Sequence, residues 1–97
     1  MARISEYPKG HFQAPKLMVS AEAYEIANMQ NVAVGIADAA ANVHSIEVSP
    51  VKDQSVWIPH STGLGVGVTA ITLPFYWIRF TSGGGTPVVY LTKERRD

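Results

Sequence analysis

Hydrophobic and polar positions alternate with a period of two over most of this chain. Residues 44–49 are the clearest case, because His44, Ile46 and Val48 alternate there with serine and glutamate. Such alternation is typical of a β-strand that buries one face. Similar short stretches occur at 32–36, 56–58, 69–73, 75–80 and 88–91. Short strands at intervals of about ten residues predict an all-β fold, either a small β-sandwich or a jelly-roll-like domain.

Residues 75–91 hold the densest run of aromatic and β-branched side chains, interrupted by a glycine triplet. This arrangement predicts a β-hairpin with a glycine loop, and we expect that hairpin to be the central pair of the sandwich. Alternation sorts its first strand into two faces, with Tyr76, Ile78 and Phe80 on one and Phe75, Trp77 and Arg79 on the other. Both faces are largely apolar. We therefore expect a second sheet on one face and a neighbouring subunit on the other, unless the strand is central in the sandwich.

Residues 17–30 allow two interpretations. With a period of two, residues 17–26 would form a strand. With a helical period, Ser20 would cap a run rich in alanine and glutamate. The segment is short and its neighbours are strands, which favours a strand, but the sequence leaves both possibilities open.

Three regions follow from these patterns: an extended N-terminal arm at 1–16, a β-sandwich domain at 17–92 and a charged C-terminal tail at 93–97. The first region contains two prolines and a glycine and has no sustained period. Disordered segments are usually poor in aromatic residues, so we expect this arm to dock on its own domain or on a neighbour. Its candidate partner-binding residues are Arg3, Tyr7, Lys9, His11 and Phe12.

Charged residues make up only 16% of the chain, and the formal net charge is zero. A surface with less charge than the roughly 25% of soluble domains favours self-association. Basic residues are concentrated towards both ends and acidic residues between them, which suits arms that lie on neighbouring copies. No basic and aromatic stripe predicts nucleic-acid binding, and no apolar run approaches the roughly 20 residues of a membrane helix. The N-terminus lacks the apolar segment of a signal peptide. We therefore expect no nucleic-acid or membrane partner.

The sequence offers little for catalysis. The absence of cysteine excludes disulfides, thiol catalysis and cysteine-rich zinc sites. No two histidines are at metal-ligand spacing on one element. Asp38, His44 or His60, and Ser61 could be drawn into a triad, but the chain has no Gly-x-Ser-x-Gly motif. The glycines at 63–67 lack the following helix and acidic residue of a dinucleotide site. We predict no catalytic, cofactor-binding or metal-ligating residue, and a protein that is not an enzyme.

Two tryptophans and an arginine form a possible ligand platform. If Trp57 and Trp77 are exposed on strands, they could stack against sugar rings while Arg79 binds hydroxyl groups. Burial in the core is the competing interpretation, because these aromatic residues lie in alternating strands where packing needs bulk.

Residues 31–92 contain the succession Asn-Val-Ala-Val-Gly-Ile-Ala-Asp, Val-His-Ser-Ile-Glu-Val-Ser-Pro, Gln-Ser-Val-Trp-Ile-Pro and the run from Ile71 to Leu91. This style of sequence resembles the small all-β virion proteins of tailed bacteriophages, which decorate capsids or fill head and tail positions. The resemblance implies a structural protein without catalysis that is made in the host cytoplasm and assembles into the virion. It also implies self-association, often as trimers, and binding to a major capsid or tail protein. The interpretation we favour is a capsid decoration or cement protein; the alternative is a carbohydrate-binding module, possibly in a phage fibre.

Overall fold

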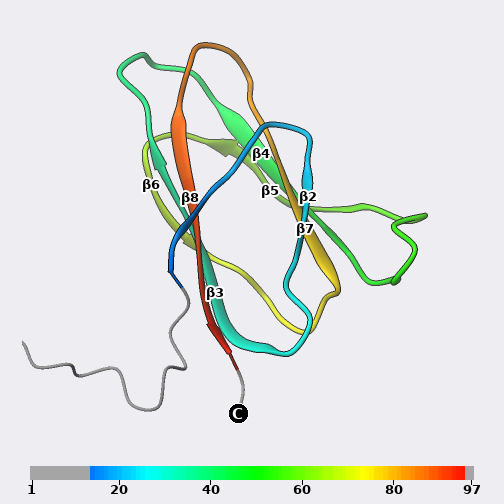
Figure 1. Ribbon diagram of the computed structural model, residues 1–97. Helices are drawn as coiled ribbons and strands as arrows, with labels where there is room; N and C mark the ends of the chain where they lie inside the picture. The colour runs from blue at the N-terminus through cyan, green and yellow to red at the C-terminus, as the bar shows by residue number, and fades with distance from the viewer. Residues whose placement is uncertain (1–13, 96–97) are drawn as a thin grey trace, which may run out of the picture.

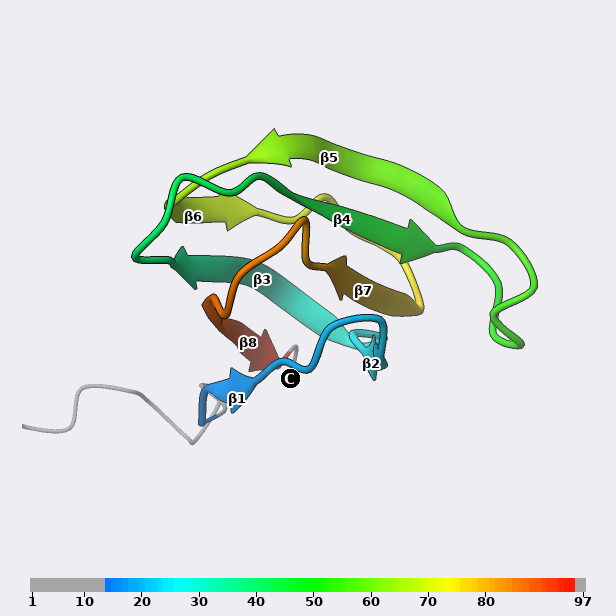
Figure 2. The same cartoon turned by 90° about the horizontal axis from the view of Figure 1, so that it is seen from above.

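The computed structural model describes residues 14–95, which form eight β-strands and no helix. The strands are β1 (Lys16–Leu17), β2 (Ala23–Glu25), β3 (Met29–Ala37), β4 (His44–Ser49), β5 (Ile58–Leu64), β6 (Gly67–Ala70), β7 (Trp77–Thr81) and β8 (Val88–Arg95). They make two antiparallel four-stranded sheets (Figures 1 and 2). The first sheet has the order β1-β8-β3-β6, and the second has the order β2-β7-β4-β5. The predicted all-β class and a sandwich-like arrangement are confirmed.

Four antiparallel strand pairs enclose one another in the sequence, as they would in one long hairpin folded over into two sheets. The chain pairs β4 with β5, β3 with β6, β2 with β7 and β1 with β8, all antiparallel. Additional pairs join β3 to β8 and β4 to β7, which completes the two sheets. The tip of this long hairpin is the connection at residues 50–57.

The core lies between the two sheets and follows the alternation in the sequence. Val32, Val34 and Ile36 point inwards from β3, and Ile46 and Val48 point inwards from β4; all five are buried. Further buried side chains come from the neighbouring strands and their connections: Met18, Ile26, Ile71, Ile78, Phe80, Val89 and Leu91. The strands predicted at 32–36 and 44–49 are therefore confirmed, because each has one face that must be removed from water.

The predicted hairpin at 75–91 is wrong. β7 belongs to the second sheet and β8 to the first, so the residues between them cross from one sheet to the other. Gly83 explains why glycine is needed in this connection, since a Cβ there would overlap the carbonyl oxygen of Val43. The glycines that resembled a hairpin turn thus allow two connections to pack closely. Ile78 and Phe80 are buried as expected, but Tyr76 precedes β7 and is 42% exposed.

Other boundaries also differ from the sequence interpretation. Residues 17–26 contain the end of β1 and the whole of β2, which lie in different sheets with a turn between them. β5 begins only at Ile58 and continues through Pro59, which a strand at a sheet edge tolerates because one side of its backbone has no partner strand. Lys16, which the sequence placed in the arm, lies in β1 and pairs with Leu91 of β8. β8 continues to Arg95, into the segment that the sequence placed in the C-terminal tail.

Candidate functional site

A buried histidine lies at the end of the sandwich where two connections between the sheets meet. The His44 side chain is fully buried, and its Nε2 lies 2.9 Å from Oδ2 of Asp38. The Gly83 N–H donates to Nδ1 of the same ring at 3.0 Å. Because an amide N–H can only donate, Nδ1 must accept, and the ring proton is therefore on Nε2 and directed at Asp38. Both ring nitrogens are satisfied in a neutral imidazole.

The Asp38 carboxylate is held by donors from its own connection. Its Oδ1 accepts from the Ala40 N–H at 3.1 Å, and its Oδ2 accepts from the Asn42 amide at 3.4 Å in addition to His44. These hydrogen bonds hold the pKa of Asp38 below its ordinary value, and the bond from the Ala40 N–H has the largest effect. The His44 ring also packs against Phe80, with 5.4 Å between the ring centroids. The cluster ties the β3–β4 connection to the β7–β8 connection at this end of the fold.

The residues that could have formed a triad lie in two separate pairs. Asp38 contacts His44, whereas Ser61 contacts His60, with 2.8 Å between Oγ and Nδ1. The Thr72 N–H donates to Nε2 of His60 at 3.0 Å, so the ring proton of a neutral His60 is on Nδ1 and is donated to Ser61. A general base for Ser61 would need the opposite arrangement. Within residues 14–95, no three histidine or acidic side chains gather where they could hold a metal ion.

The three residues of the possible ligand platform lie near one another on the solvent side of the second sheet. The Arg79 guanidinium lies 4.1 Å above the Trp57 ring and donates from Nε and Nη2 to Oε1 of Glu47, at 2.9 and 2.7 Å. Trp77 is two residues from Arg79 on β7, and its indole N–H donates to the carbonyl of Lys52 at 2.9 Å. These groups are already paired with one another or with the backbone. A ligand that stacks on this face of Trp57 would have to displace Arg79.

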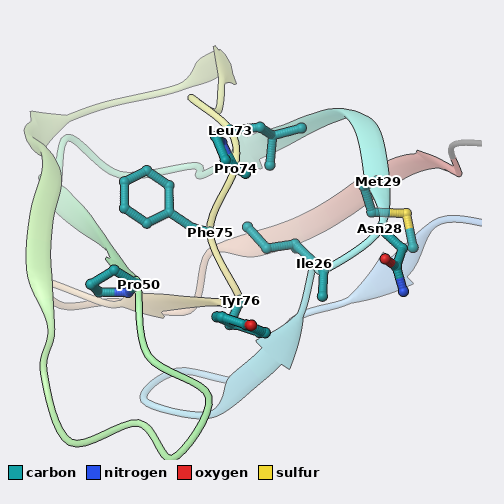
Figure 3. A pocket seen from close by; sticks show the side chains of 9 residues that line it. Ile26, Asn28, Met29, Pro50, Leu73, Pro74, Phe75 and Tyr76 are labelled. Atoms are coloured by element: carbon teal, nitrogen blue, oxygen red, sulfur yellow. The ribbon is translucent and has the colours of Figure 1, made fainter.

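An apolar pocket lies at the other end of the sandwich, where the β2–β3 turn meets the chain before β7 (Figure 3). Its volume is about 420 Å³. The lining residues are Ile26, Ala27, Asn28, Met29, Pro50, Leu73, Pro74, Phe75 and Tyr76. The pocket has hydrophobic walls and no charged group in its lining, so it offers shape but no catalytic chemistry.

The outer face of the first sheet is the largest feature that the sequence interpretation missed. The strand registers place Leu17, Tyr90, Gly35 and Val68 side by side in one row across β1, β8, β3 and β6. Leu17, Tyr90 and Val68 are 54%, 45% and 79% exposed. The two neighbouring rows are also uncharged. One consists of Val88 and Ala37, and the other consists of Thr92, Ala33 and Ala70. We call these nine residues the outer face.

The outer face has a polar border and a shallow hollow. Beyond the row of Thr92, the Asn31 amide donates to the carboxylate of Glu94 at 2.6 Å, so this acidic group is paired. The hollow, of about 330 Å³, is lined by three residues of the outer face and by four residues on its border, two of them charged: Ala33, Ala70, Thr92, Asn31, Val32, Lys93 and Glu94. Exposed apolar side chains next to a hollow are characteristic of a surface that another molecule covers.

No family model, no curated protein and no solved structure matches this chain. Within the part of the chain that the structure describes, no helix is long and apolar enough to cross a membrane.

The sequence-predicted site residues have different outcomes. Trp57, Trp77 and Arg79 share one face of the second sheet. The predicted arm residues Arg3, Tyr7, Lys9, His11 and Phe12 lie outside the described residues. The outer face had a signal in the sequence, since alanine and glycine alternate with the core residues of β3, but its extent depends on pairings between distant strands.

Proposed function

We propose that this chain is a structural virion protein, namely a capsid decoration or cement protein that self-associates and binds a larger viral protein lattice. The observation that carries the proposal is the uncharged outer face of the first sheet. Its exposed side chains Leu17, Val68, Val88 and Tyr90 come from β1, β6 and β8, far apart in sequence. A contiguous apolar surface on a small domain is a typical site of protein–protein contact.

The nesting of the strands supports the jelly-roll part of this proposal. In this proposal, the four nested antiparallel pairs, with the sheet orders β1-β8-β3-β6 and β2-β7-β4-β5, make up an eight-stranded jelly roll with two Greek keys. Jelly rolls build viral capsid proteins as well as lectins, and this is an argument by analogy of fold alone. In this proposal, residues 1–16 act as an extended arm that binds a neighbouring copy or a major capsid or tail protein.

The virion assignment can be tested by labelling particles. Tailed-phage virions purified from the host that makes this chain would be incubated with a gold-conjugated antibody against the purified protein and imaged by electron microscopy. We expect regular label on the head or tail, and none when the antibody is first absorbed with the protein. Intact particles without label would refute a structural role in the virion.

A second candidate, a carbohydrate-binding module, is favoured by the gathering of Trp57, Trp77 and Arg79 on one face. Sugar rings stack on exposed tryptophan, and lectins are among the jelly-roll proteins. A titration with a panel of glycans would quench tryptophan fluorescence if this face binds sugar, and Trp57→Ala would abolish the quenching. Unchanged fluorescence across the panel would exclude this candidate.

A further inference from the structure

We propose that two copies of this chain pair face to face through the outer face of the first sheet, related by a two-fold axis. This inference deepens the proposed function, on which its biological meaning rests, by naming the first partner of the chain.

Gly35 is the residue that the single chain does not explain. It lies in the middle of β3, a central strand of the first sheet, and its side-chain position points outwards between Tyr90 and Val68. Its φ is not in the left-handed region, and a Cβ there would meet only Cγ2 of Val68 at 3.9 Å, an ordinary contact. Neither the backbone nor the packing of one copy therefore requires glycine. Glycine in a strand interior weakens the strand and often marks a place where another backbone approaches closely.

The shape of the outer face is suited to its own copy. Leu17, Tyr90 and Val68 project from it, whereas Gly35 leaves a notch and the hollow of about 330 Å³ lies one row away. In a two-fold interface, each contact is made twice with the two copies exchanged. A projecting side chain of one copy can thus fill the recess of the other while its own recess is filled in return.

The charge of the face fits a second copy, and its size fits a weak, reversible pair. The four strands have 2, 8, 9 and 4 residues, which at about 3.3 Å per residue and about 4.8 Å between strands give a flat area of roughly 360 Å² per copy. Pairing would cover roughly 700 Å² in total, which is the size of a weak interface whose two copies exchange with the monomer. The chain has no net charge, and the outer face carries no charged residue among its nine members, so identical copies do not repel. These properties favour a second copy over nucleic acid or a charged surface.

Two exposed valines provide the test. Val68 is 79% exposed and lies on the outer face, whereas Val56 is 45% exposed and lies in the connection between β4 and β5 of the second sheet. Val68→Lys would place a charge in the proposed interface, and Val56→Lys would place the same charge at the tip of the second sheet, outside the interface. Gly35→Ala would fill the notch with a single methyl group. None of the three changes removes a buried contact within one copy, so each variant should fold, which its melting temperature would verify.

The masses of the full chain and the three variants would be measured by sedimentation equilibrium over three decades of concentration. We expect the unmodified chain and Val56→Lys to approach twice the monomer mass of 10.5 kDa with the same dissociation constant. We expect Val68→Lys and Gly35→Ala to weaken association at least tenfold. A monomer at every concentration, a trimer, or equal weakening by both lysine variants would overturn the inference. The particle-labelling experiment does not depend on this result, so the inference and the proposed function can fail separately.

Discussion

Replacing Gly83 by alanine is the sharpest test of how the two sheets are held together at one end. A Cβ at this position would overlap the carbonyl oxygen of Val43 and lie 2.9 Å from its carbonyl carbon. Both neighbours are backbone atoms, so no rotation of a side chain can relieve the clash. The connection between β7 and β8 must therefore move away from the connection between β3 and β4.

The magnitude follows from what this movement breaks. The Gly83 N–H donates to Nδ1 of His44, whose side chain is fully buried. A buried acceptor that loses its partner costs about 1 to 3 kcal/mol, and the displaced loop loses further contacts. We expect Gly83→Ala to lower the free energy of unfolding by about 3 kcal/mol or more. For a domain of this size, such a loss lowers the melting temperature by roughly 12 °C or more.

Urea denaturation followed by tryptophan fluorescence would measure this loss, and Gly65 offers a matched control. A Cβ at Gly65 would meet nothing within 4 Å, and its φ is not in the left-handed region. Gly65→Ala should therefore change the free energy of unfolding by less than about 1 kcal/mol. If Gly83→Ala and Gly65→Ala had the same small effect, the close approach of the two connections and the role of the His44 hydrogen bond would be refuted.

Two further predictions concern charged groups. The hydrogen bonds to Asp38 lower its pKa, so its charge stabilises the fold fully above the unfolded-state pKa of about 4, and this contribution is lost as the pH falls through the lowered pKa. The difference in urea midpoint between the unmodified chain and Asp38→Asn should thus be constant near neutral pH and shrink below about pH 4; a difference that grows on acidification would contradict this. Arg79→Lys should lower the free energy of unfolding by only about 1 kcal/mol, because the Arg79–Glu47 pair is 29% exposed on each side, and should shift the Trp57 emission. A loss above about 2 kcal/mol by urea titration would show that this pair does more than a surface interaction.

The sequence predicts the strands of this protein better than their partners. Alternation identifies β3 and β4 because each buries one face in a single core. The glycine triplet at 83–85 has the composition of a hairpin turn, but its conformation is required by packing against Val43 and Asn42, which are distant in sequence. Local composition encodes where the chain bends and leaves open whether it returns to the same sheet.

The candidate surfaces show the same limit. Trp57, Trp77 and Arg79 could be named because two of them alternate on one predicted strand and Trp57 lies in another, at 56–58. Leu17, Gly35, Val68 and Tyr90 are ordinary residues one by one, and they become a row only through the registers of three strand pairs. Register is set by the whole sheet, so a surface composed across strands is not visible in any one segment.

The nested pairing gives the chain a definite order in which it can close. Thr92 and Ala33 hydrogen-bond although they are 59 positions apart, whereas β4 and β5 are joined by the short connection at 50–57. Because the entropy lost on closing a loop grows with its length, we expect β4 and β5 to pair first and β1 to pair with β8 last. Pulsed hydrogen exchange during refolding would test this order, since amides of β4 should be protected before those of β3 that bond to β8. While a ribosome is still making β8, β3 lacks one neighbour and β1 has none, so the newly made chain presents open sheet edges until β8 emerges.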